Sequence, residues 1–398
     1  MSYIDLVILA GGKGSRIKNL NKNKPKPLAK IGSYSFLDLL LGNLSRYHFR
    51  KIFILAGYKG SQIYKKYHKK NINFMDIECV IEKKPLGTGG SLMQIKNKLS
   101  KNFFVINGDT IADFNFYKML KLKKNHNSVI AITKSKYVDN GNQIRNLQID
   151  QKKIIKINNN RKSKNYKNAG VCLFDKKIFN KIKLEKFSLE DEILYKLIKQ
   201  KKIYGYKEKF FFYDIGTIKD FKAAKKSLFK HFKKPAIFLD RDNTINLDKG
   251  YTYKLNDFKF INNSLNALKY LSRKKVWIFI ITNQAGIAKG YYTENDFKNL
   301  HLKLKEKLLK KKIFIDEVKY CPYHPKATLL KYKKNSSLRK PNNLMIKQIF
   351  KTWAIDKKKS IMIGDQIKDY KCAAKSKIKF QYVENNMLKQ VRNYLNKI

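Results

Sequence analysis

Two aspartates near the middle of the chain, Asp240 and Asp242, directly follow the apolar run Ala236-Ile-Phe-Leu. Side chains two residues apart in an extended strand point to the same side, so both carboxylates can face one site where the strand ends. One carboxylate can attack the phosphorus of a phosphate ester, while a second carboxylic acid protonates the departing oxygen. The spacing therefore predicts a site with two neighbouring carboxylates at the end of this strand.

A glycine-rich turn near the start of the sequence predicts a second site. Leu9-Ala-Gly-Gly-Lys-Gly-Ser-Arg16 follows a short apolar run and precedes Pro25-Lys-Pro-Leu28. Glycines let backbone N–H groups approach a triphosphate closely, and basic side chains neutralise its charge. The predicted phosphate-binding and neutralising residues are Gly11, Gly12, Lys13, Gly14, Arg16 and Lys26. A plain tight turn is the alternative, because the loop matches neither the dinucleotide fingerprint nor the P-loop.

Two separated carboxylates in the same half predict a metal site. Asp109 follows an apolar run in Asn107-Gly-Asp, where an ordinary turn residue is the alternative. Asp214 stands in an otherwise apolar run, and a buried carboxylate without a partner is costly. We expect both to hold Mg²⁺, which would screen the repulsion between two phosphate-bearing reactants.

These motifs resemble those of the sugar-phosphate nucleotidyltransferases, over about residues 3–225. The glycine-rich loop matches the signature of that family, and further motifs match in order: Pro85-Leu-Gly-Thr-Gly-Gly-Ser91, Asn107-Gly-Asp109-Thr, Asn168-Ala-Gly170 and Tyr213-Asp214-Ile-Gly-Thr217. In such a reaction a sugar 1-phosphate oxygen attacks the α-phosphorus of a nucleoside triphosphate and expels pyrophosphate, so the protein mainly aligns two anions. The resemblance implies catalysis by Arg16 and Lys26, nucleotide binding by Gly87 and Thr88, sugar binding by Asn168 and Gly170, and metal binding by Asp109 and Asp214.

The second half resembles the haloacid dehalogenase-like phosphatases, whose four motifs occur here in order. They are Asp240-Arg-Asp242, Thr282-Asn283, Arg339-Lys340 and Gly364-Asp365 with Asp369. The resemblance implies that Asp240 forms an aspartyl phosphate and that Asp242 protonates the leaving sugar oxygen and then deprotonates water. It implies phosphate contacts from Thr282, Asn283, Arg339 and Lys340, and Mg²⁺ held by Asp240, the backbone carbonyl of Asp242 and Asp365, with Asp369 in support.

Within that superfamily, about residues 235–385 look like the heptose 1,7-bisphosphate 7-phosphatases, with histidinol-phosphate phosphatase as a cousin. The likeness rests on Asp248-Lys-Gly-Tyr251, on residues 282–294 and on Cys321-Pro-Tyr-His-Pro325.

One departure from that family concerns its structural zinc, often bound through Cys-x-His and Cys-x-Cys pairs. Cys321 is present, but Tyr323 stands in the histidine's place, and Ser336 and Leu338 replace the second pair. One thiolate does not make a tetrahedral zinc site. We therefore expect no zinc, with His324 as a neighbouring candidate ligand.

Composition bounds these interpretations. The chain has 398 residues, enough for two domains or more, and 43% of them are hydrophobic, which excludes a disordered protein. The longest apolar stretch, near Val276–Ile281, is too short to cross a bilayer, and the first residues do not read as a signal peptide. Four scattered cysteines predict no disulfide framework and indicate the cytoplasm.

Charge is the unusual feature of the composition: 88 basic and 30 acidic residues give a net charge of +58. Lysine runs are spread along the whole chain, which favours lysines tolerated on solvated faces over a binding patch. A nucleic acid or an anionic membrane surface is the alternative partner. We expect small-molecule substrates, namely sugar phosphates and a nucleoside triphosphate, and no specific nucleic-acid or membrane partner.

Short apolar runs alternate with amphipathic segments in both halves, which predicts α/β domains built on parallel sheets with helices on both faces. Ligands of such sheets bind beyond the carboxyl ends of the strands, where the motifs fall. A helical segment over 220–234 ends at Pro235. We therefore predict a Rossmann-like (GT-A-like) nucleotidyltransferase domain over 1–232 and a haloacid dehalogenase-like parallel-sheet domain over 233–398.

The two predicted activities fit together, because loss of the 7-phosphate yields the heptose 1-phosphate that a nucleotidyltransferase accepts. Phe212-Tyr-Asp-Ile-Gly-Thr217 and Ser188-Leu-Glu-Asp-Glu192 make the first half most similar to the D-glycero-α-D-manno-heptose 1-phosphate guanylyltransferases. We expect a bifunctional enzyme of nucleotide-activated heptose synthesis, with GTP as the nucleotide. Two alternatives stay open, since fold does not fix substrate: another sugar phosphate with GTP, UTP or dTTP, or a polycationic binding protein on an inactive scaffold.

Overall fold

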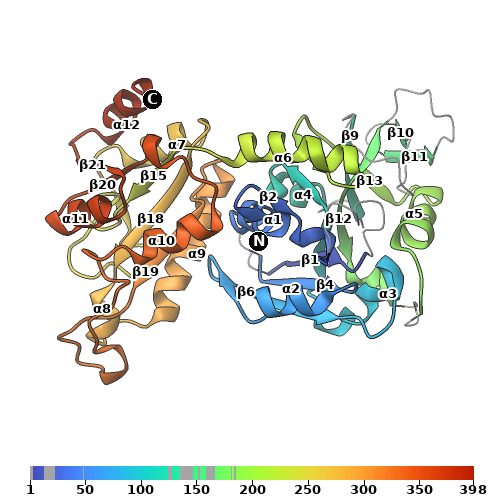
Figure 1. Ribbon diagram of the computed structural model, residues 1–398, viewed down its shortest axis with the longest axis horizontal. Helices are drawn as coiled ribbons and strands as arrows, with labels where there is room; N and C mark the ends of the chain where they lie inside the picture. The colour runs from blue at the N-terminus through green and yellow to red at the C-terminus, as the bar shows by residue number, and fades with distance from the viewer. Residues whose placement is uncertain are drawn as a thin grey trace. The chain divides into compact units, whose positions relative to one another are not determined.

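The computed structural model describes residues 3–12, 23–47, 49–123, 128–134, 147–150, 153–157, 166–180, 182 and 185–398. Lys13, Gly14 and Arg16 of the predicted nucleotide loop therefore lie outside the described residues. The chain divides into two compact units, residues 1–229 and 230–398 (Figure 1). Among the described residues, every helix is too short or too polar to cross a bilayer.

The first unit is built on a ten-stranded sheet. In order across the sheet, its strands are β10 (Leu147–Asp150), β11 (Lys153–Ile157), β13 (Ile203–Lys207), β9 (Ser128–Thr133), β12 (Lys167–Asp175), β7 (Asn102–Asn107), β1 (Asp5–Ala10), β4 (Lys51–Ala56), β6 (Met75–Ile81) and β5 (Asn71–Ile72). Strands β7, β1, β4 and β6 run parallel, as predicted, whereas β12 is antiparallel to both β7 and β9. The sheet is therefore mixed and not wholly parallel. The sequence did not indicate this, because an apolar run predicts a strand but not its direction.

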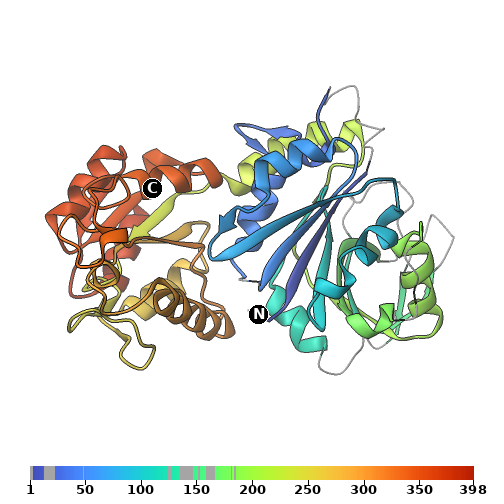
Figure 2. The ribbon, with the colours of Figure 1, turned by 90° about the horizontal axis from the view of Figure 1, so that it is seen from below.

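Helices lie on both sides of this sheet (Figure 2). They are α1 (Phe36–Ser45), α2 (Gly60–Tyr67), α3 (Gly87–Met93), α4 (Phe116–Lys123), α5 (Tyr195–Lys199) and α6 (Ile218–Phe232). Two short pairs, β2 (Lys30–Ile31) with β3 (Tyr34–Ser35) and β8 (Thr110–Asp113) with β14 (Phe211–Asp214), complete the unit. The second pair matters for function, because it aligns Thr110 with Asp214.

The second unit is built on a five-stranded parallel sheet in the order β19 (Glu317–Cys321), β18 (Trp277–Asn283), β15 (Ala236–Leu239), β20 (Ile361–Gly364) and β21 (Lys379–Tyr382). Strands β15 and β20 are buried along their whole length, which is typical of a parallel sheet covered on both faces. The predicted α/β architecture is confirmed in both units.

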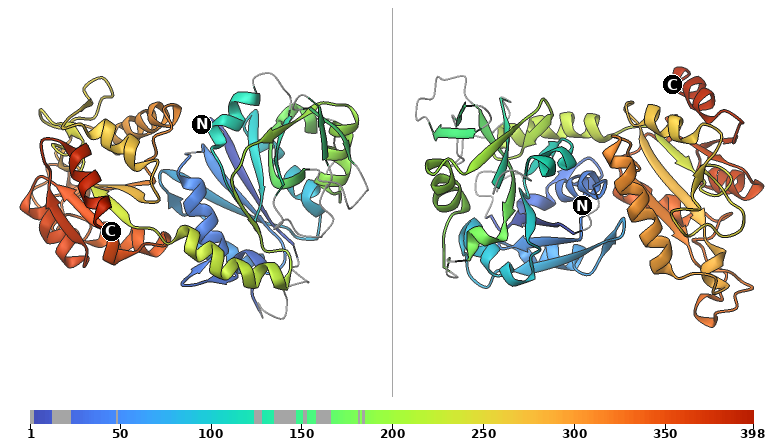
Figure 3. Two further views of the ribbon diagram at one scale, coloured as in Figure 1. Left: turned by 90° about the horizontal axis from the view of Figure 1, so that it is seen from above. Right: turned by 180° about the vertical axis from the view of Figure 1, so that it is seen from behind.

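The helices of this unit are α7 (Ser264–Leu271), α8 (Ala285–Ala288), α9 (Glu294–Lys310), α10 (Leu344–Thr352), α11 (Ile367–Lys375) and α12 (Met387–Asn396), and a small pair joins β16 (Asn246–Leu247) to β17 (Lys259–Phe260). The long helix α9 runs beside the sheet (Figure 3), and its Phe297 ring lies 4.4 Å from the Tyr320 ring of β19. Helix α11 begins with a capping box between Gln366 and Asp369, which fixes where Asp369 stands.

An aromatic cluster anchors α10 to this sheet. The Trp353 ring lies 4.7 Å from that of Trp277 and 5.4 Å from that of Phe279, and its Nε1 donates to the buried Glu317 carboxylate at 2.7 Å. Loss of this ring would leave a cavity and remove the hydrogen bond to a buried carboxylate.

We expect Trp353→Ala to lower the free energy of unfolding of the second unit by about 3–5 kcal/mol. The chain has 2 tryptophans, Trp277 and Trp353, so urea unfolding followed by the fluorescence of the remaining Trp277 reports this unit. The 82% exposed Leu330 gives the control, Leu330→Ala, which should leave the unfolding midpoint unchanged. An equal effect of both substitutions would contradict the packing described.

Candidate active sites

The ammonium group of Lys340 lies in an acidic site at the carboxyl ends of β15 and β20. Its Nζ is 2.7 Å from Asp240 Oδ1 and 2.6 Å from Asp369 Oδ1, and it donates to the carbonyl oxygen of Ile281 at 2.9 Å. The side chains of Lys340 and Asp369 are wholly buried. Burial alone would lower the pKa of Lys340, but the two carboxylates outweigh it and raise the pKa. Lys340 is therefore a buried cation held between two carboxylates.

Asp240, the predicted nucleophile, directly follows β15 and is held by hydrogen bonds to backbone groups. Its N–H donates to the Ile363 carbonyl oxygen at 2.9 Å, and its Oδ1 accepts from the Arg241 N–H at 2.7 Å. Burial raises the pKa of Asp240 to about 7, against the lowering effect of Lys340. A second positive charge beside Asp240 would favour the ionised carboxylate that attack on phosphorus requires.

Asp240 and Asp365, two of the residues predicted to hold Mg²⁺ in this unit, come together with Asp369, the predicted supporting residue. Asp240, Asp365 and Asp369 each place an oxygen within 4.8 Å of the other two. Asp365 Oδ1 is buried and has no hydrogen-bond partner among the described residues. A buried acceptor without a partner is unusual, and a bound cation would satisfy it. Carboxylate oxygens are the ligands that Mg²⁺ prefers, so these residues fit such an ion.

Asp369 is engaged on both sides, as expected of a supporting residue. Oδ1 faces Lys340, while Oδ2 accepts from the Gln366 N–H at 3.1 Å at the start of α11. A Cβ on Gly364 would lie 2.6 Å from Asp369 Cβ, so only glycine leaves room for this side chain. The strand end therefore needs Gly364 for packing, whereas Asp365 beside it faces the acidic site.

The predicted phosphate-binding residues around Lys340 have different surroundings. Thr282 is buried at the end of β18. The Asn283 side chain donates to the Lys340 carbonyl oxygen and accepts from the Lys340 N–H, both at 3.0 Å, so it holds the backbone that carries the ammonium group. Arg339 Nη1 donates to the Tyr323 carbonyl oxygen at 3.4 Å. Phosphate contacts from Asn283 and Arg339 remain predictions.

Side chains to which the sequence analysis gave no role hold Asp242 in place, directly or through a neighbour. Arg241 Nη2 lies 2.7 Å from Asp242 Oδ1, and Gln284 Nε2 donates to Oδ2 at 2.9 Å. The Tyr292 hydroxyl donates to Gln284 Oε1 at 2.5 Å. Gln284 follows the Thr282-Asn283 motif directly, which was the available signal.

The segment predicted to lack zinc is held by ordinary contacts. Burial raises the pKa of the Cys321 thiol, and His324 Nδ1 accepts from the Lys326 N–H at 3.0 Å. Lys334 Nζ lies 3.8 Å from the centre of the Tyr323 ring, the residue that stands in the histidine's place. The absence of zinc stays a prediction.

In the first unit, the pairing of β8 with β14 brings the two predicted metal ligands to one hydroxyl group. Thr110 Oγ1 lies 3.5 Å from Asp109 Oδ1 and 3.3 Å from Asp214 Oδ2. Asp214 is 1% exposed, and Lys26 Nζ contacts Asp109 Oδ2 at 2.5 Å. Two carboxylates suit Mg²⁺, which commonly takes its remaining ligands from water and substrate phosphates. The structure thus brings Asp109, Asp214 and Lys26 together.

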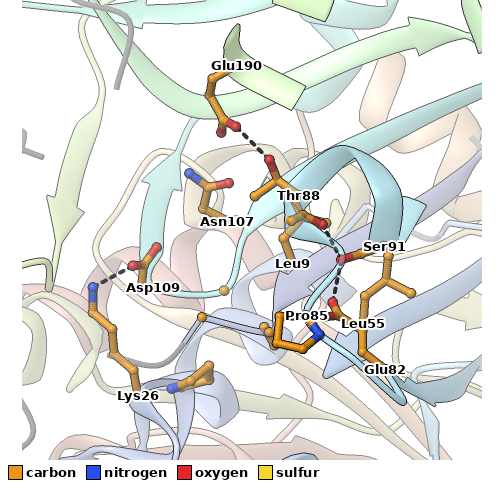
Figure 4. Close-up of a pocket in the computed structure, with 16 residues that line it drawn as sticks. Leu9, Lys26, Leu55, Glu82, Pro85, Thr88, Ser91, Asn107, Asp109 and Glu190 are labelled. Atoms are coloured by element: carbon orange, nitrogen blue, oxygen red, sulfur yellow. Dashed lines mark hydrogen bonds and ion pairs between the residues drawn. The ribbon is translucent and has the colours of Figure 1, made fainter. Parts of the chain in front are cut away.

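A pocket of about 340 Å³ adjoins these residues at the carboxyl ends of β1, β6 and β7 (Figure 4). It is lined by Gly11, Gly12, Gly87 and Thr88, which were predicted to bind the nucleotide, and by Asp109, which was predicted to bind the metal. Glu82, Ser91, Asn107 and Glu190, which the sequence analysis did not assign, also line it. A Cβ on Gly11 would lie 2.8 Å from Glu82 Oε1, and one on Gly87, at φ +72°, would lie 2.4 Å from the Phe187 carbonyl oxygen. Gly87 is therefore required by its backbone conformation and by close approach, whereas a side chain at Gly11 would displace the Glu82 carboxylate.

Hydrogen bonds fix the unassigned carboxylates in this pocket. Thr88 Oγ1 donates to Glu190 Oε2 at 2.7 Å, and the Leu189 N–H donates to Thr88 Oγ1 at 2.8 Å. The Ser91 hydroxyl contacts Glu82 Oε1. The glycine-rich motif at 85–91 therefore fixes the position of both carboxylates, Glu190 and Glu82.

The predicted sugar-binding residues belong to an irregular part of β12. Asn168 is buried, and its Oδ1 accepts from the Gly170 N–H at 2.8 Å. Gly170 has φ +67°, and a Cβ there would lie 3.1 Å from Asn107 Nδ2. Their contact with a sugar remains a prediction.

The acidic site of the second unit predicts that a divalent cation stabilises that unit. We expect Mg²⁺ to raise its melting temperature, because a ligand that binds only the folded state adds about 2.7 kcal/mol of stability at 100 times its dissociation constant. Asp365→Ala should abolish most of this shift, and Asp356→Ala, outside the site, should not. Tryptophan fluorescence melts with and without Mg²⁺ make the measurement, and an unchanged shift in Asp365→Ala would contradict the assignment.

Comparisons with known proteins match the two halves of the chain to two different families. Residues 6–231 match the family described as nucleotidyl transferase, and residues 235–390 match the family described as polynucleotide kinase 3 phosphatase. HddC from Yersinia pseudotuberculosis, a solved structure, is 28% identical with a TM-score of 0.49, and the match covers 56% of this chain and 99% of that one.

Curated relatives match the second half. The D-glycero-beta-D-manno-heptose-1,7-bisphosphate 7-phosphatase of Haemophilus influenzae is 38% identical over 144 residues, which are 36% of this chain and 78% of that protein. The protein of the same name from Photorhabdus laumondii is 39% identical over 144 residues, 36% of this chain and 77% of that protein. The predicted fusion is thus confirmed: the chain belongs to the nucleotidyl transferase family through its first half and to the family of these heptose bisphosphate phosphatases through its second.

Proposed function

We propose that this chain is a bifunctional enzyme of nucleotide-activated heptose synthesis. Residues 233–398 remove the 7-phosphate of D-glycero-D-manno-heptose 1,7-bisphosphate, and residues 1–232 transfer a nucleotidyl group to the heptose 1-phosphate that remains. The observation that carries the proposal is the presence, in one chain, of the buried Asp240–Lys340–Asp369 cluster and of the pocket beside Asp109. The names of the phosphatase relatives support the choice of sugar.

In the phosphatase reaction, a carboxylate oxygen of Asp240 bonds to phosphorus while the bond from phosphorus to the sugar oxygen breaks. Asp242 gives its proton to that oxygen, then takes a proton from the water that hydrolyses the aspartyl phosphate. Lys340 and the Thr282 hydroxyl hold the phosphate oxygens. Lys340 suits this role because its charge is already fixed by two carboxylates.

In the transferase reaction, an oxygen of the sugar 1-phosphate attacks the α-phosphorus and pyrophosphate leaves. The protein mainly aligns the sugar phosphate with the triphosphate. Lys26 lies close to the metal-binding acids, and Gly11 and Gly12 let the phosphates approach the loop. Asn168 and Gly170 would contact the sugar. In both units bound Mg²⁺ would neutralise phosphate charge and so permit anions to approach one another.

Glu82 supports GTP as the nucleotide. Its carboxylate lines the pocket beside Gly11, and it contacts the Ser91 hydroxyl on one oxygen. Guanine presents two adjacent donors, N1–H and the 2-amino group, which one carboxylate can accept together. Uracil, thymine and adenine present no such pair of donors. Because nucleoside triphosphates are made in the cytoplasm, we place the enzyme there.

The activity is tested with the purified full chain. The phosphatase panel contains both anomers of the heptose bisphosphate, histidinol phosphate and hexose bisphosphates; the transferase panel combines heptose and hexose 1-phosphates with GTP, UTP and dTTP. We expect the highest kcat/KM with the heptose bisphosphate and with GTP plus heptose 1-phosphate. Asp240→Asn should abolish phosphate release and leave pyrophosphate release unchanged. A preference for a hexose would overturn the choice of sugar, and loss of both activities would overturn the assignment of separate sites.

Glu82→Gln tests the base preference. Replacing one carboxylate oxygen by an NH₂ group removes a charge-assisted acceptor, so kcat/KM with GTP should fall about 10- to 100-fold, whereas kcat/KM with UTP should hold or rise. Glu78→Gln, on strand β6, which ends directly before Glu82, removes a carboxylate paired with Lys51 and Lys98. It is the matched control and should keep the GTP-to-UTP ratio. Equal losses with both nucleotides in Glu82→Gln would contradict guanine recognition by this residue.

A further inference from the structure

The two oxygens of Asp242 differ in the number of donors they contact. Oδ1 accepts from Arg241 Nε at 2.8 Å and from Asn246 Nδ2 at 3.3 Å, and it lies 2.7 Å from Arg241 Nη2. Oδ2 accepts from Gln284 Nε2 at 2.9 Å. Two hydrogen bonds and the guanidinium charge occupy Oδ1, so Oδ2 is the oxygen with room to bind a proton that is to be transferred. The group that sets the position of Oδ2 is the Gln284 amide.

The orientation of that amide follows from its neighbours. An ionised carboxylate only accepts hydrogen bonds, so the NH₂ end of Gln284 must face Asp242 and the oxygen must face Tyr292. The Tyr292 hydroxyl donates to that oxygen at 2.5 Å. Burial, more than any other factor, raises the pKa of Tyr292 far above its usual range, so the hydroxyl stays protonated and remains a donor.

Packing holds Tyr292 and Gln284 rigidly. Gln284 is 1% exposed, and its backbone N–H donates to the Cys321 carbonyl oxygen at 2.8 Å. The Tyr292 ring stacks on Tyr253 with centroids 5.0 Å apart, and a Cβ on Gly286 would lie 2.3 Å from it. The Tyr292 ring cannot turn without disturbing its packing, and the Gln284 side chain cannot turn without losing its hydrogen bonds to Asp242 and Tyr292.

The second hydrogen of the amide reaches the phosphate-binding hydroxyl. Gln284 Nε2 also lies 2.7 Å from Thr282 Oγ1. Because the amide donates to this oxygen, the hydroxyl hydrogen of Thr282 is free to point elsewhere, toward a phosphate oxygen. One NH₂ group thus contacts both the residue that handles the proton and the residue that holds the phosphate.

We propose that Gln284, fixed by Tyr292, is a positioning residue that aligns Asp242 Oδ2 with the leaving oxygen and directs the Thr282 hydroxyl at the phosphate. This inference rests on the proposed function, in which Asp242 is the general acid and Thr282 binds phosphate. Gln284 itself does not touch the reacting atoms.

The test compares two phosphate esters in the full chain with Mg²⁺: p-nitrophenyl phosphate, whose leaving group needs no proton, and the sugar phosphate that the wild type hydrolyses fastest. A defect in proton donation lowers kcat/KM for the sugar phosphate alone, whereas a defect in phosphate binding lowers kcat/KM for both substrates. We expect Gln284→Leu and Tyr292→Phe each to lower the ratio of the two kcat/KM values, sugar phosphate over p-nitrophenyl phosphate, about 10-fold or more. Asp242→Asn should lower the same ratio further.

Controls separate the alternatives. Thr282→Val should lower both kcat/KM values equally, and Tyr394→Phe, which removes another buried tyrosine hydroxyl outside the site, should change neither. In the double variant Asp242→Asn/Gln284→Leu the ratio should equal that of Asp242→Asn alone, because Gln284 acts on it through Asp242.

The outcomes distinguish this inference from the function on which it rests. If Asp242→Asn lowers the ratio but Gln284→Leu and Tyr292→Phe do not, the positioning role is overturned and the general acid stands. If Asp242→Asn leaves the ratio unchanged, the assignment of the general acid itself fails. Tyr292→Phe keeps the ring and its packing, so it decides the question even where Gln284→Leu unfolds.

Discussion

A buried ammonium group between two buried carboxylates is the interaction on which the second unit's site depends. Lys340 and Asp369 are wholly buried, and Asp240 is nearly so. Any one of these charges alone would be costly in such surroundings, and two carboxylates without the lysine would repel each other. The three are contributed by separate segments of the chain, so the sheet must bring those segments to one point. Asn283 secures the arrangement, because its amide binds the backbone of Lys340 on both sides.

The first unit also holds charged side chains close together, but it does so with a pair of short strands. Its two acids stand on paired strands, β8 and β14, on either side of the Thr110 hydroxyl, and Lys26 balances the more exposed Asp109. The glycine-rich segments around Gly11 and Gly87 line the pocket beside these acids, and a Cβ at Gly87 would collide with the Phe187 carbonyl oxygen. In both units the fold gathers charges of both signs at strand ends, and anionic substrates can bind where those charges are already compensated.

Much of this could be predicted from the sequence, and the exceptions have physical reasons. Asp240 and Asp365 follow apolar runs, so their place at the mouth of a parallel sheet could be derived from strand geometry, whereas Asp369 is placed by the first turn of α11. The mixed direction of the first sheet could not, because β12 carries the same apolar pattern whichever way it runs. Gln284 and Asp242 are 42 residues apart, and nothing local to either indicates that their side chains meet. The place of Glu82 in the pocket could not be predicted either, since a lone carboxylate before a glycine-rich motif is common in solvated loops.

The pairing of β8 with β14 also has a consequence for how the protein is made. Thr110 and Asp214, which this pairing brings into contact, are 104 residues apart in the chain. On the ribosome, the nucleotide loop and Asp109 are therefore synthesised long before Asp214 emerges to complete the acid pair. Because β14 immediately precedes the helix at the boundary of the two units, the first catalytic centre becomes whole only as translation of the second begins, and a chain that stops earlier carries an incomplete one.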